Sequence, residues 1–347
     1  MNKVSIEAII PIPIPRFNFD RIPRKQIRLN TLSLLKNRNG IQSFDFCEYG
    51  MVFPTFIISE PTKELENDFQ LPIFQANIMI LHITLEVGVP DYIEVQHGHS
   101  NKVETITGQE AIEFHKTNIY SLFEKRIYDY AFAINLSTSN SLQLNEGIIR
   151  FKGDKYYRKT KCLNPEFILD AFALSQNKQW PEFKSLSFDQ IWVWLNNQKG
   201  FMDGFGGGRT GRALNSIVNI SFQENYDSPE SLFWAMVGLE SLFTSGKSGL
   251  LEQVKDKSQV LLGQQISFKK ILNEMYNFRS RFVHGDLDFP TPHHLYDSDE
   301  IMKYYFEVSE SLQIAVAVLI CSIQELISRN WDGLNFSYIV NEFQEEG

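Results

Sequence analysis

The chain has 347 residues, of which 43% are hydrophobic and 13% aromatic, and its formal net charge is −9 at pH 7. This length and apolar content exclude a disordered chain and favour two packed domains over one. The acidic charge argues against a protein that holds nucleic acid by overall electrostatic attraction, and Cys47, Cys162 and Cys321 have neither zinc-ribbon spacing nor a disulfide framework.

The start of the chain predicts no export signal. Residues 1–7 lack the basic-then-apolar order of a signal peptide, and Pro11, Pro13 and Pro15 interrupt the only early apolar run. The late apolar run, Ile314 to Ile320, is far shorter than the roughly 20 residues of a membrane helix and is expected to be a buried helix segment. We therefore expect a cytoplasmic protein with no membrane contact.

Residues 1–185 predict a strand-rich α+β domain, because their apolar residues alternate or form short runs. The sequence does not reveal its role; sensing a trigger and positioning a substrate are the two expectations. Strands are expected within Met51–Ile58, Asn77–Leu85, Ala131–Leu136 and Ile148–Phe151, and a helix is expected over Gly108–Lys125.

The stretch from Arg150 to Lys161 interleaves basic and aromatic residues. One interpretation is an RNA contact, in which Lys155, Arg158 and Lys159 meet phosphates beside stacked bases. The other is a solvated strand or loop, since most runs of charged residues are solvent-exposed surface without a binding role.

The histidines of the first domain do not predict a metal site. His97 and His99 share one face if their segment is a strand, with Glu94 nearby, but a third ligand at suitable spacing is missing and a loop is favoured. His82 and His115 are expected to be packing residues. We therefore expect neither a metal nor a cofactor.

Residues 186–347 predict an all-helical domain. Its helices are interrupted by a glycine-rich segment, Gly204 to Arg212, which lacks the Lys-Ser or Lys-Thr of a Walker A loop. This segment is either a flexible connector or a mobile lid whose Arg209 and Arg212 contact an anionic substrate.

Two further helices follow this loop. Ser228 and Pro229 supply the cap and the first position of a helix that runs through Phe243 and carries Glu240 on its apolar face. The last long helix is expected from about Asp299 to Ser328.

A helix between those two carries the most informative residues. The segment from Ser267 to His284 has apolar residues at helical spacing, and Gly285 can end it. At roughly 100° per residue, Arg279 falls inside the apolar stripe whereas Arg281 projects into solvent. A guanidinium buried there needs a carboxylate, carbonyl groups or an anionic ligand. Glu240 is the predicted carboxylate.

Arg279 and His284 form an R-x4-H motif at the end of this helix, which resembles the signature of the HEPN ribonucleases, in particular the Apea-like HEPN family. The resemblance covers approximately residues 186–326. It includes an upstream helix with the pattern Ala235, Leu239, Glu240, Leu242 and Phe243.

The resemblance implies metal-independent cleavage of RNA to a 2′,3′-cyclic phosphate and a 5′-hydroxyl. His284 would transfer the proton, Arg279 would stabilise charge on the phosphate, and Arg281 would bind substrate. Glu240 and Ser280 would support them, Ser280 standing where many HEPN motifs carry a polar residue. Family roles include antiphage defence and toxin–antitoxin systems, with a homodimer formed through the HEPN domain and a regulatory protein or phage-derived trigger as a further partner.

The spacing of the motif raises a geometric difficulty. On an ideal helix Arg279 and His284 lie about 140° apart, which is unsuited to two groups acting on one phosphate. Either the last turn unwinds at Gly285 and brings His284 inward, or two copies assemble one composite site.

Two rival functions stay open at this point. The first is a non-catalytic HEPN bundle that binds RNA, a nucleotide or a protein, with Arg279 held in a structural ion pair by Glu240. The second is a metal enzyme built around His97 and His99. His293 and His294 are expected at the surface, with a supporting acid–base role open.

Overall fold

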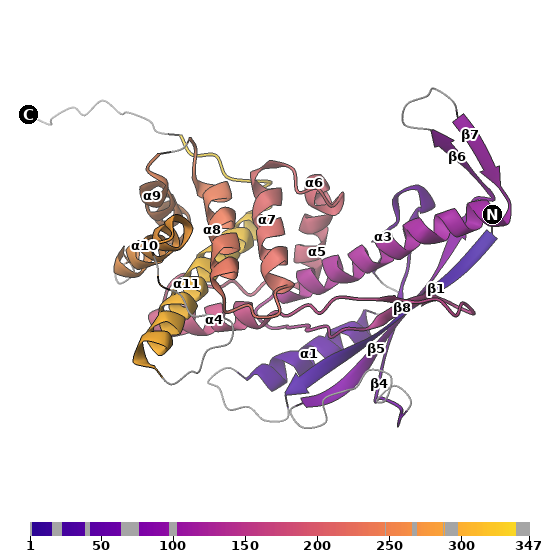
Figure 1. The fold of residues 1–347 in the computed structure, drawn as a ribbon, viewed down its shortest axis with the longest axis horizontal. Coiled ribbons are helices and arrows are strands. Elements are labelled where there is room, and N and C mark those ends of the chain that lie inside the picture. The colour runs from indigo at the N-terminus through magenta and orange to yellow at the C-terminus, as the bar shows by residue number, and fades with distance from the viewer. Residues whose placement is uncertain are drawn as a thin grey trace, which may run out of the picture. The chain divides into compact units, whose positions relative to one another are not determined.

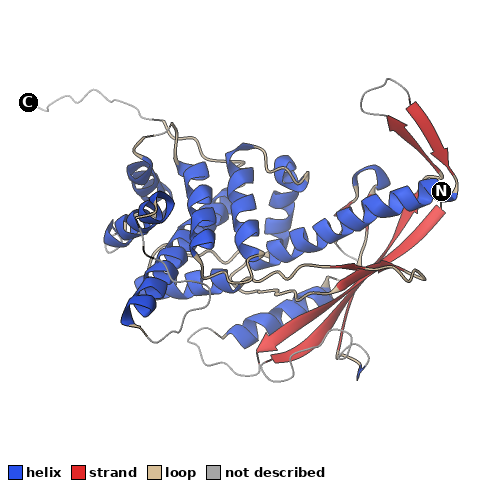
Figure 2. Ribbon diagram, viewed as in Figure 1, coloured by secondary structure: helices blue, strands red, loops and turns tan. Residues whose placement is uncertain are grey.

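The computed structural model describes residues 2–15, 23–38, 42–63, 76–96, 103–246, 248–265, 269–286, 288 and 298–337, with the backbone alone at 76, 199 and 269–271. As predicted, the chain is α+β, with a strand-rich part followed by helices (Figures 1 and 2). It forms two compact units. Unit 1 is Met1–Leu169 with Ser221–Tyr226, and unit 2 is Asp170–Ile220 with Asp227–Gly347. The division thus lies earlier in the chain than the predicted boundary at residue 185.

Unit 1 is built on an antiparallel sheet of five strands in the order β4-β5-β1-β8-β9. Two further pairs, β2 with β3 and β6 with β7, lie outside it. The elements are β1 (Asn2–Pro15), α1 (Arg24–Asn37), β2 (Phe44–Asp45), η1 (Cys47–Tyr49), β3 (Met51–Val52), β4 (Thr55–Ser59), β5 (Ala76–Val89), β6 (Tyr92–Gln96), β7 (Val103–Thr107), α3 (Gln109–Asn135), β8 (Ile148–Phe151) and β9 (Arg158–Lys159).

The long strands β1 and β5 pair from end to end. Alternate residues of β1 are buried from Val4 to Ile10, and every residue is buried from Ile10 to Ile14. Helix α3 covers this buried face. Its Tyr130 stacks on Phe56 of β4 with ring centroids 5.1 Å apart. Its Tyr120 meets Phe151 of β8 edge to face at 4.8 Å. The core of unit 1 therefore lies between α3 and one face of the sheet.

Pro11 and Pro13 lie in the part of β1 that pairs with β5 on one side and has no partner strand on the other. β8 pairs with β1 only from Ile6 to Ile9, so Pro11 and Pro13 do not remove a donor from that ladder. Their carbonyl groups are satisfied by other donors. The Asn145 amide donates to Pro11 at 3.0 Å, and a guanidinium nitrogen of Arg28 donates to Pro13 at 2.7 Å.

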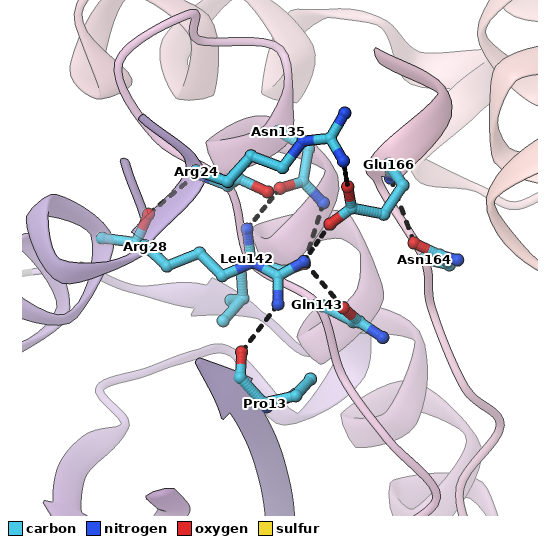
Figure 3. A network of polar contacts seen from close by, with 10 residues as sticks. Pro13, Arg24, Arg28, Asn135, Leu142, Gln143, Asn164 and Glu166 are labelled. Atoms are coloured by element: carbon cyan, nitrogen blue, oxygen red, sulfur yellow. Dashed lines mark hydrogen bonds and ion pairs between the residues drawn. The ribbon is translucent and has the colours of Figure 1, made fainter. Parts of the chain in front are cut away.

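Arg28 of α1 is the centre of a buried polar network (Figure 3). Besides the Pro13 carbonyl it donates to Gln143 Oε1 at 2.7 Å and to a carboxylate oxygen of Glu166. Arg24 meets the other oxygen of Glu166 at 3.1 Å. Arg28 is 4% exposed, and burial lowers the pKa of its guanidinium while Glu166 raises it. The network joins α1, β1 and the first residue of α4 (Glu166–Lys178).

One strand prediction in this unit is wrong. A strand is predicted over residues 131–136, but 131–135 form the end of α3 and Leu136 is its C-cap, so the helix runs ten residues beyond the predicted Lys125. All six are buried and only Asn135 is polar, so the segment shows no helical alternation. Such a run does not distinguish a buried helix from a buried strand. The strands predicted over Asn77–Leu85 and Ile148–Phe151 are confirmed as β5 and β8.

His82 and His115 both take part in specific contacts. His115 is buried, with Nδ1 at 2.9 Å from the Tyr49 hydroxyl and Nε2 at 3.1 Å from the Tyr92 carbonyl. Because a carbonyl only accepts, Nε2 carries the proton and Tyr49 donates to Nδ1. On the sheet, the Glu7 carboxylate meets Nε2 of His82 at 2.9 Å and Nε of Arg150 at 2.6 Å.

The Glu7 contacts predict a pH-dependent contribution to stability. Burial raises the pKa of Glu7, but bonds from Arg150 and His82 outweigh it and leave the pKa below its ordinary value of 4.5. A carboxyl with a lowered pKa stabilises the fold above its ordinary pKa and loses that effect as pH falls through the lowered value. The difference in the free energy of unfolding between the wild type and Glu7→Gln should therefore be largest above about pH 5 and should decrease below it. Denaturation followed by far-UV circular dichroism from pH 3 to 6 measures it, and a constant gap would contradict the expectation.

Unit 2 is helical. Its elements are most of α4, then α5 (Phe188–Asn197), α6 (Lys199–Met202), α7 (Gly208–Ser221), α8 (Pro229–Phe243), α9 (Leu250–Leu262), α10 (Lys269–His284) and α11 (Asp299–Arg329). Helix α11 contacts α5, α8, α9 and α10. Its predicted buried segment from Ile314 to Ile320 is confirmed. Among the described helices, α11 has the length and composition to cross a membrane. However, 83% of its most apolar stretch of 18 residues is buried within the fold, as in the core helix of a soluble protein.

Several predicted helix ends are confirmed. Ser228 accepts from the Ser231 amide at 3.3 Å with Pro229 next to it, and Ser298 caps α11. Gly285 has φ +76° directly after α10. Ser267, at which the predicted helical segment begins, lies outside the described residues.

The glycine-rich segment is shorter than predicted, since α7 already begins at Gly208. One of its glycines, Gly211, and the preceding Gly200 are needed for close packing. A Cβ on Gly211 would lie 2.7 Å from the Gly206 carbonyl carbon, and one on Gly200 would lie 2.7 Å from the Gly207 nitrogen. Two backbone segments approach each other here more closely than a residue with a Cβ atom would allow. These two glycines therefore have a packing role.

Candidate functional site

Helices α8 and α10 place Glu240 and Arg279 side by side, as their positions on two amphipathic helices predict. Arg279 Nη2 lies 3.7 Å from Glu240 Oε1. The side chains are 28% and 21% exposed, so the pair lies at the margin of the core, less buried than the apolar stripe suggested.

The contact is an ion pair without a hydrogen bond, because 3.7 Å exceeds hydrogen-bonding distance. Glu240 Oε1 and Arg279 Nε are both buried, and neither has a hydrogen-bond partner among the residues that the structure describes. A buried polar atom left unbonded costs about 1–3 kcal/mol, so native structures keep few of them and those few often serve function. Glu240 thus holds the guanidinium in place without using its hydrogen-bonding capacity.

Tyr276 is a neighbour of this pair that the sequence did not reveal. It precedes Arg279 by one helical turn, is 8% exposed, and its hydroxyl is a further buried polar atom without a hydrogen-bond partner among the described residues. We call Glu240, Tyr276 and Arg279 the α8–α10 polar cluster. A tyrosine in an apolar stripe resembles an ordinary core residue, so only its spacing from Arg279 could have indicated this role.

Burial dominates the electrostatics of this cluster. It raises the pKa of the Glu240 carboxyl, and the positive charge of Arg279 only partly offsets this. Burial also raises the pKa of the Tyr276 hydroxyl, and the charge of Glu240 raises it further. Burial therefore disfavours the charged forms of both the Glu240 carboxyl and the Tyr276 hydroxyl.

His284 is the last residue of α10, and its side chain is exposed. The Asp286 amide donates to the Arg281 carbonyl at 2.8 Å and the Gly285 amide to the Phe282 carbonyl at 3.4 Å, which is the hydrogen-bond pattern of a Schellman cap. The helix is therefore regular up to His284, and the first of the two alternatives, unwinding of the last turn at Gly285, is not observed.

Ser280 and Arg281 are exposed, as the helical spacing predicts. Arg281 lines a groove of about 290 Å³ between α10 and α11. Its other polar lining residues are Glu274, Asn277, Glu307, Glu310 and Ser311. Three carboxylates around one guanidinium repel a phosphate, so the groove itself does not suit RNA.

The glycine-rich segment supplies one structural and one exposed arginine. Arg209 donates to the Thr244 carbonyl just beyond α8, and Lys257 donates to the Phe243 carbonyl at 2.8 Å. Both cations thus bind at the negative end of the α8 dipole. Burial, followed by the charge of Arg209, lowers the pKa of Lys257. Arg212 is exposed, so of the two arginines only it projects freely into solvent.

The other predicted site residues lie in unit 1, away from this cluster in the chain. Lys155 and Lys159 are exposed, and the Arg158 guanidinium lies over the Tyr120 ring at 4.7 Å. His97 and His99 lie outside the described residues, as do His293 and His294. Within the part of the chain that the structure describes, no three His, Cys, Asp or Glu side chains gather to hold a metal ion.

No protein-family model matches the chain, and comparisons with curated proteins and with solved structures find no match.

The geometry of the Glu240–Arg279 pair predicts weak coupling between the two residues. A double-mutant cycle with Glu240→Gln and Arg279→Gln should give at most about 1 kcal/mol, because the pair is unbonded and partly exposed. Tryptophan fluorescence is a suitable probe, since all five tryptophans lie in unit 2. Coupling of about 3–5 kcal/mol would instead assign Arg279 to a structural ion pair.

Proposed function

We propose that unit 2 is an Apea-like HEPN ribonuclease domain that cleaves RNA without a metal ion. The observation that carries the proposal is the α8–α10 polar cluster. In it, Arg279 lies 3.7 Å from Glu240, and its buried Nε has no hydrogen-bond partner within the described part of the chain. A guanidinium that is held in position and still has hydrogen-bond donors to offer can stabilise the charge that develops on a phosphate. His284, exposed at the end of the same helix, supplies the proton-transfer group of the R-x4-H motif.

The reaction uses the nucleophile that RNA carries. The 2′-oxygen attacks the adjacent phosphorus as its proton passes to a base, and the bond from phosphorus to the 5′-oxygen breaks as that oxygen gains a proton. Imidazole can accept or donate a proton near neutral pH, so His284 suits either step. Arg279 offers a planar fork of donors to the phosphoryl oxygens. The products are a 2′,3′-cyclic phosphate and a 5′-hydroxyl.

The complete site requires two copies of the chain. Arg279 faces α8 whereas His284 follows five residues later, about 140° around the helix and about 7.5 Å along it. Since α10 stays regular to its end, one chain does not direct both groups at one phosphate. Pairing through a two-fold axis brings Arg279 of one copy near His284 of the other. This homodimer acts in the cytoplasm as a defence or toxin-type effector, under a regulatory protein or phage-derived trigger.

A second function is favoured by one observation, the ion pair itself. If Glu240 holds Arg279 permanently, unit 2 is a non-catalytic HEPN bundle that binds RNA, a nucleotide or a protein. The double-mutant cycle described above separates the two functions, because only the non-catalytic bundle requires strong coupling.

A substrate comparison tests the proposed reaction. Two oligonucleotides of one sequence are compared, one entirely RNA and one with a single 2′-deoxy sugar at the mapped cleavage position. Cleavage should stop at that position alone, because the substitution removes the nucleophile and little else. Continued cleavage there would exclude attack by the 2′-oxygen.

A further inference from the structure

Unit 1 concentrates positive charge in one short segment. Residues 150–161 contain six lysines and arginines and one aspartate, a net charge of +5 within a chain of net charge −9. The segment forms β8, the turn that follows it, and β9, which is the last strand at one edge of the sheet. A patch this local can attract a polyanion although the whole chain is acidic.

Two of these cations are already neutralised. Glu7 meets Arg150 Nε at 2.6 Å, and Glu146 meets Lys159 Nζ at 2.7 Å. By contrast Lys152, Lys155 and Lys161 are exposed and have no ion pair with any carboxylate that the structure describes. Their charges therefore remain available to phosphates.

Exposed aromatic rings lie among these lysines. Tyr156 is 64% exposed and Tyr157 is 50% exposed. Tyr156 is supported from below by Tyr120 of α3, whose ring meets it edge to face at 6.1 Å. Tyr120 also packs on Phe151 at 4.8 Å and carries the Arg158 guanidinium over its ring at 4.7 Å. Because Tyr120 is itself buried, it anchors an exposed ring and a guanidinium beside each other.

We propose that this basic–aromatic edge binds single-stranded RNA. The edge consists of Lys152, Lys155, Tyr156, Tyr157, Arg158 and Lys161. Unpaired bases stack on the exposed tyrosine rings while lysines contact the backbone phosphates. A duplex hides its base faces and gains only the phosphate contacts. Every base has an aromatic face, so the edge tolerates many sequences. The choice of RNA over DNA as the cellular ligand rests on the proposed function of unit 2, whereas the binding itself does not.

Fluorescence anisotropy with two labelled oligonucleotides of about 12 nucleotides, one single-stranded RNA and one single-stranded DNA, tests the proposal. The full chain carries Arg279→Ala, so the RNA probe stays intact. Both probes should bind, and an unlabelled duplex should compete poorly.

Substitutions at the edge should then weaken binding of both probes. Tyr156→Leu keeps an apolar side chain without an aromatic face and should weaken binding roughly tenfold. Lys155→Ala should weaken it about threefold and reduce the slope of log affinity against log salt by about 0.7. Lys36→Ala is the matched control, since Lys36 is an exposed lysine on α1 of the same unit and its loss should change nothing.

Three outcomes would overturn the proposal: wild-type affinity in both edge variants, a duplex that competes as well as a single strand, or binding to anionic phospholipid vesicles with none to either probe. The last result would assign the edge to a membrane surface. Because binding is measured without cleavage, tight binding of both probes by a chain that cuts no RNA would refute the proposed function and leave this inference intact.

Discussion

Replacing His284 with alanine should lower the rate of RNA cleavage by about 10²–10⁴-fold, which is the usual contribution of a general acid or base. The loss should appear in kcat, because His284 transfers a proton in the transition state and contributes little to the binding of the RNA substrate. The side chain is exposed at the end of α10, so the variant should fold normally. Single-turnover cleavage of a labelled RNA measures the effect.

Two variants on the same helix make this result specific. Arg279→Ala should lower the rate by about 10²–10³-fold through lost stabilisation of charge on the phosphate. Arg281→Ala removes an equal charge from an exposed position two residues away and should raise KM with little change in kcat. Equal rises in KM with unchanged kcat in all three variants would show that α10 merely binds RNA.

The largest expected loss of stability is at Arg28. Arg28→Ala should lower the free energy of unfolding by about 3–5 kcal/mol, because it breaks a buried pair and leaves acceptors unsatisfied. Those acceptors are the Pro13 carbonyl and Gln143. Far-UV circular dichroism reports on both units, whereas the tryptophans report on unit 2 alone. Comparing the two transitions assigns the loss to unit 1.

Arg24→Ala is the matched control for this prediction. Arg24 binds the same Glu166 carboxylate at 3.1 Å, but it is 22% exposed where Arg28 is 4% exposed. Removing it leaves Glu166 paired with Arg28, so the loss should be about 1 kcal/mol or less. Similar losses in the two variants would show that the charge of Glu166, and not the burial of Arg28, determines stability in this network.

Local chemistry explains which parts of the fold could be predicted. The ends of α8, α10 and α11 follow from Ser228, Gly285 and Ser298, because capping depends on side chains within a few residues. The pairing of Glu240 with Arg279 was also predictable, since each is a charge on an otherwise apolar helix face.

Distant contacts explain what could not be predicted. Arg28 bonds to residues 115 and 138 positions away, and nothing near it in the sequence reveals them. The end of α3 was mistaken for a strand because burial on all sides removes the helical period. His82 seemed isolated because its partner Glu7 is 75 positions away on a neighbouring strand. Tyr276 was missed because apolar spacing does not show whether a hydroxyl finds a partner.

The most direct test of the central claim is to incubate the purified chain and its His284→Ala variant with total tRNA and single-stranded RNA in the presence of a chelator, and to map the ends of the products. Chelator-resistant cleavage that leaves 2′,3′-cyclic phosphates and 5′-hydroxyls, and that the variant lacks, is the predicted result. Cleavage that the variant retains, or that the chelator abolishes, would contradict it.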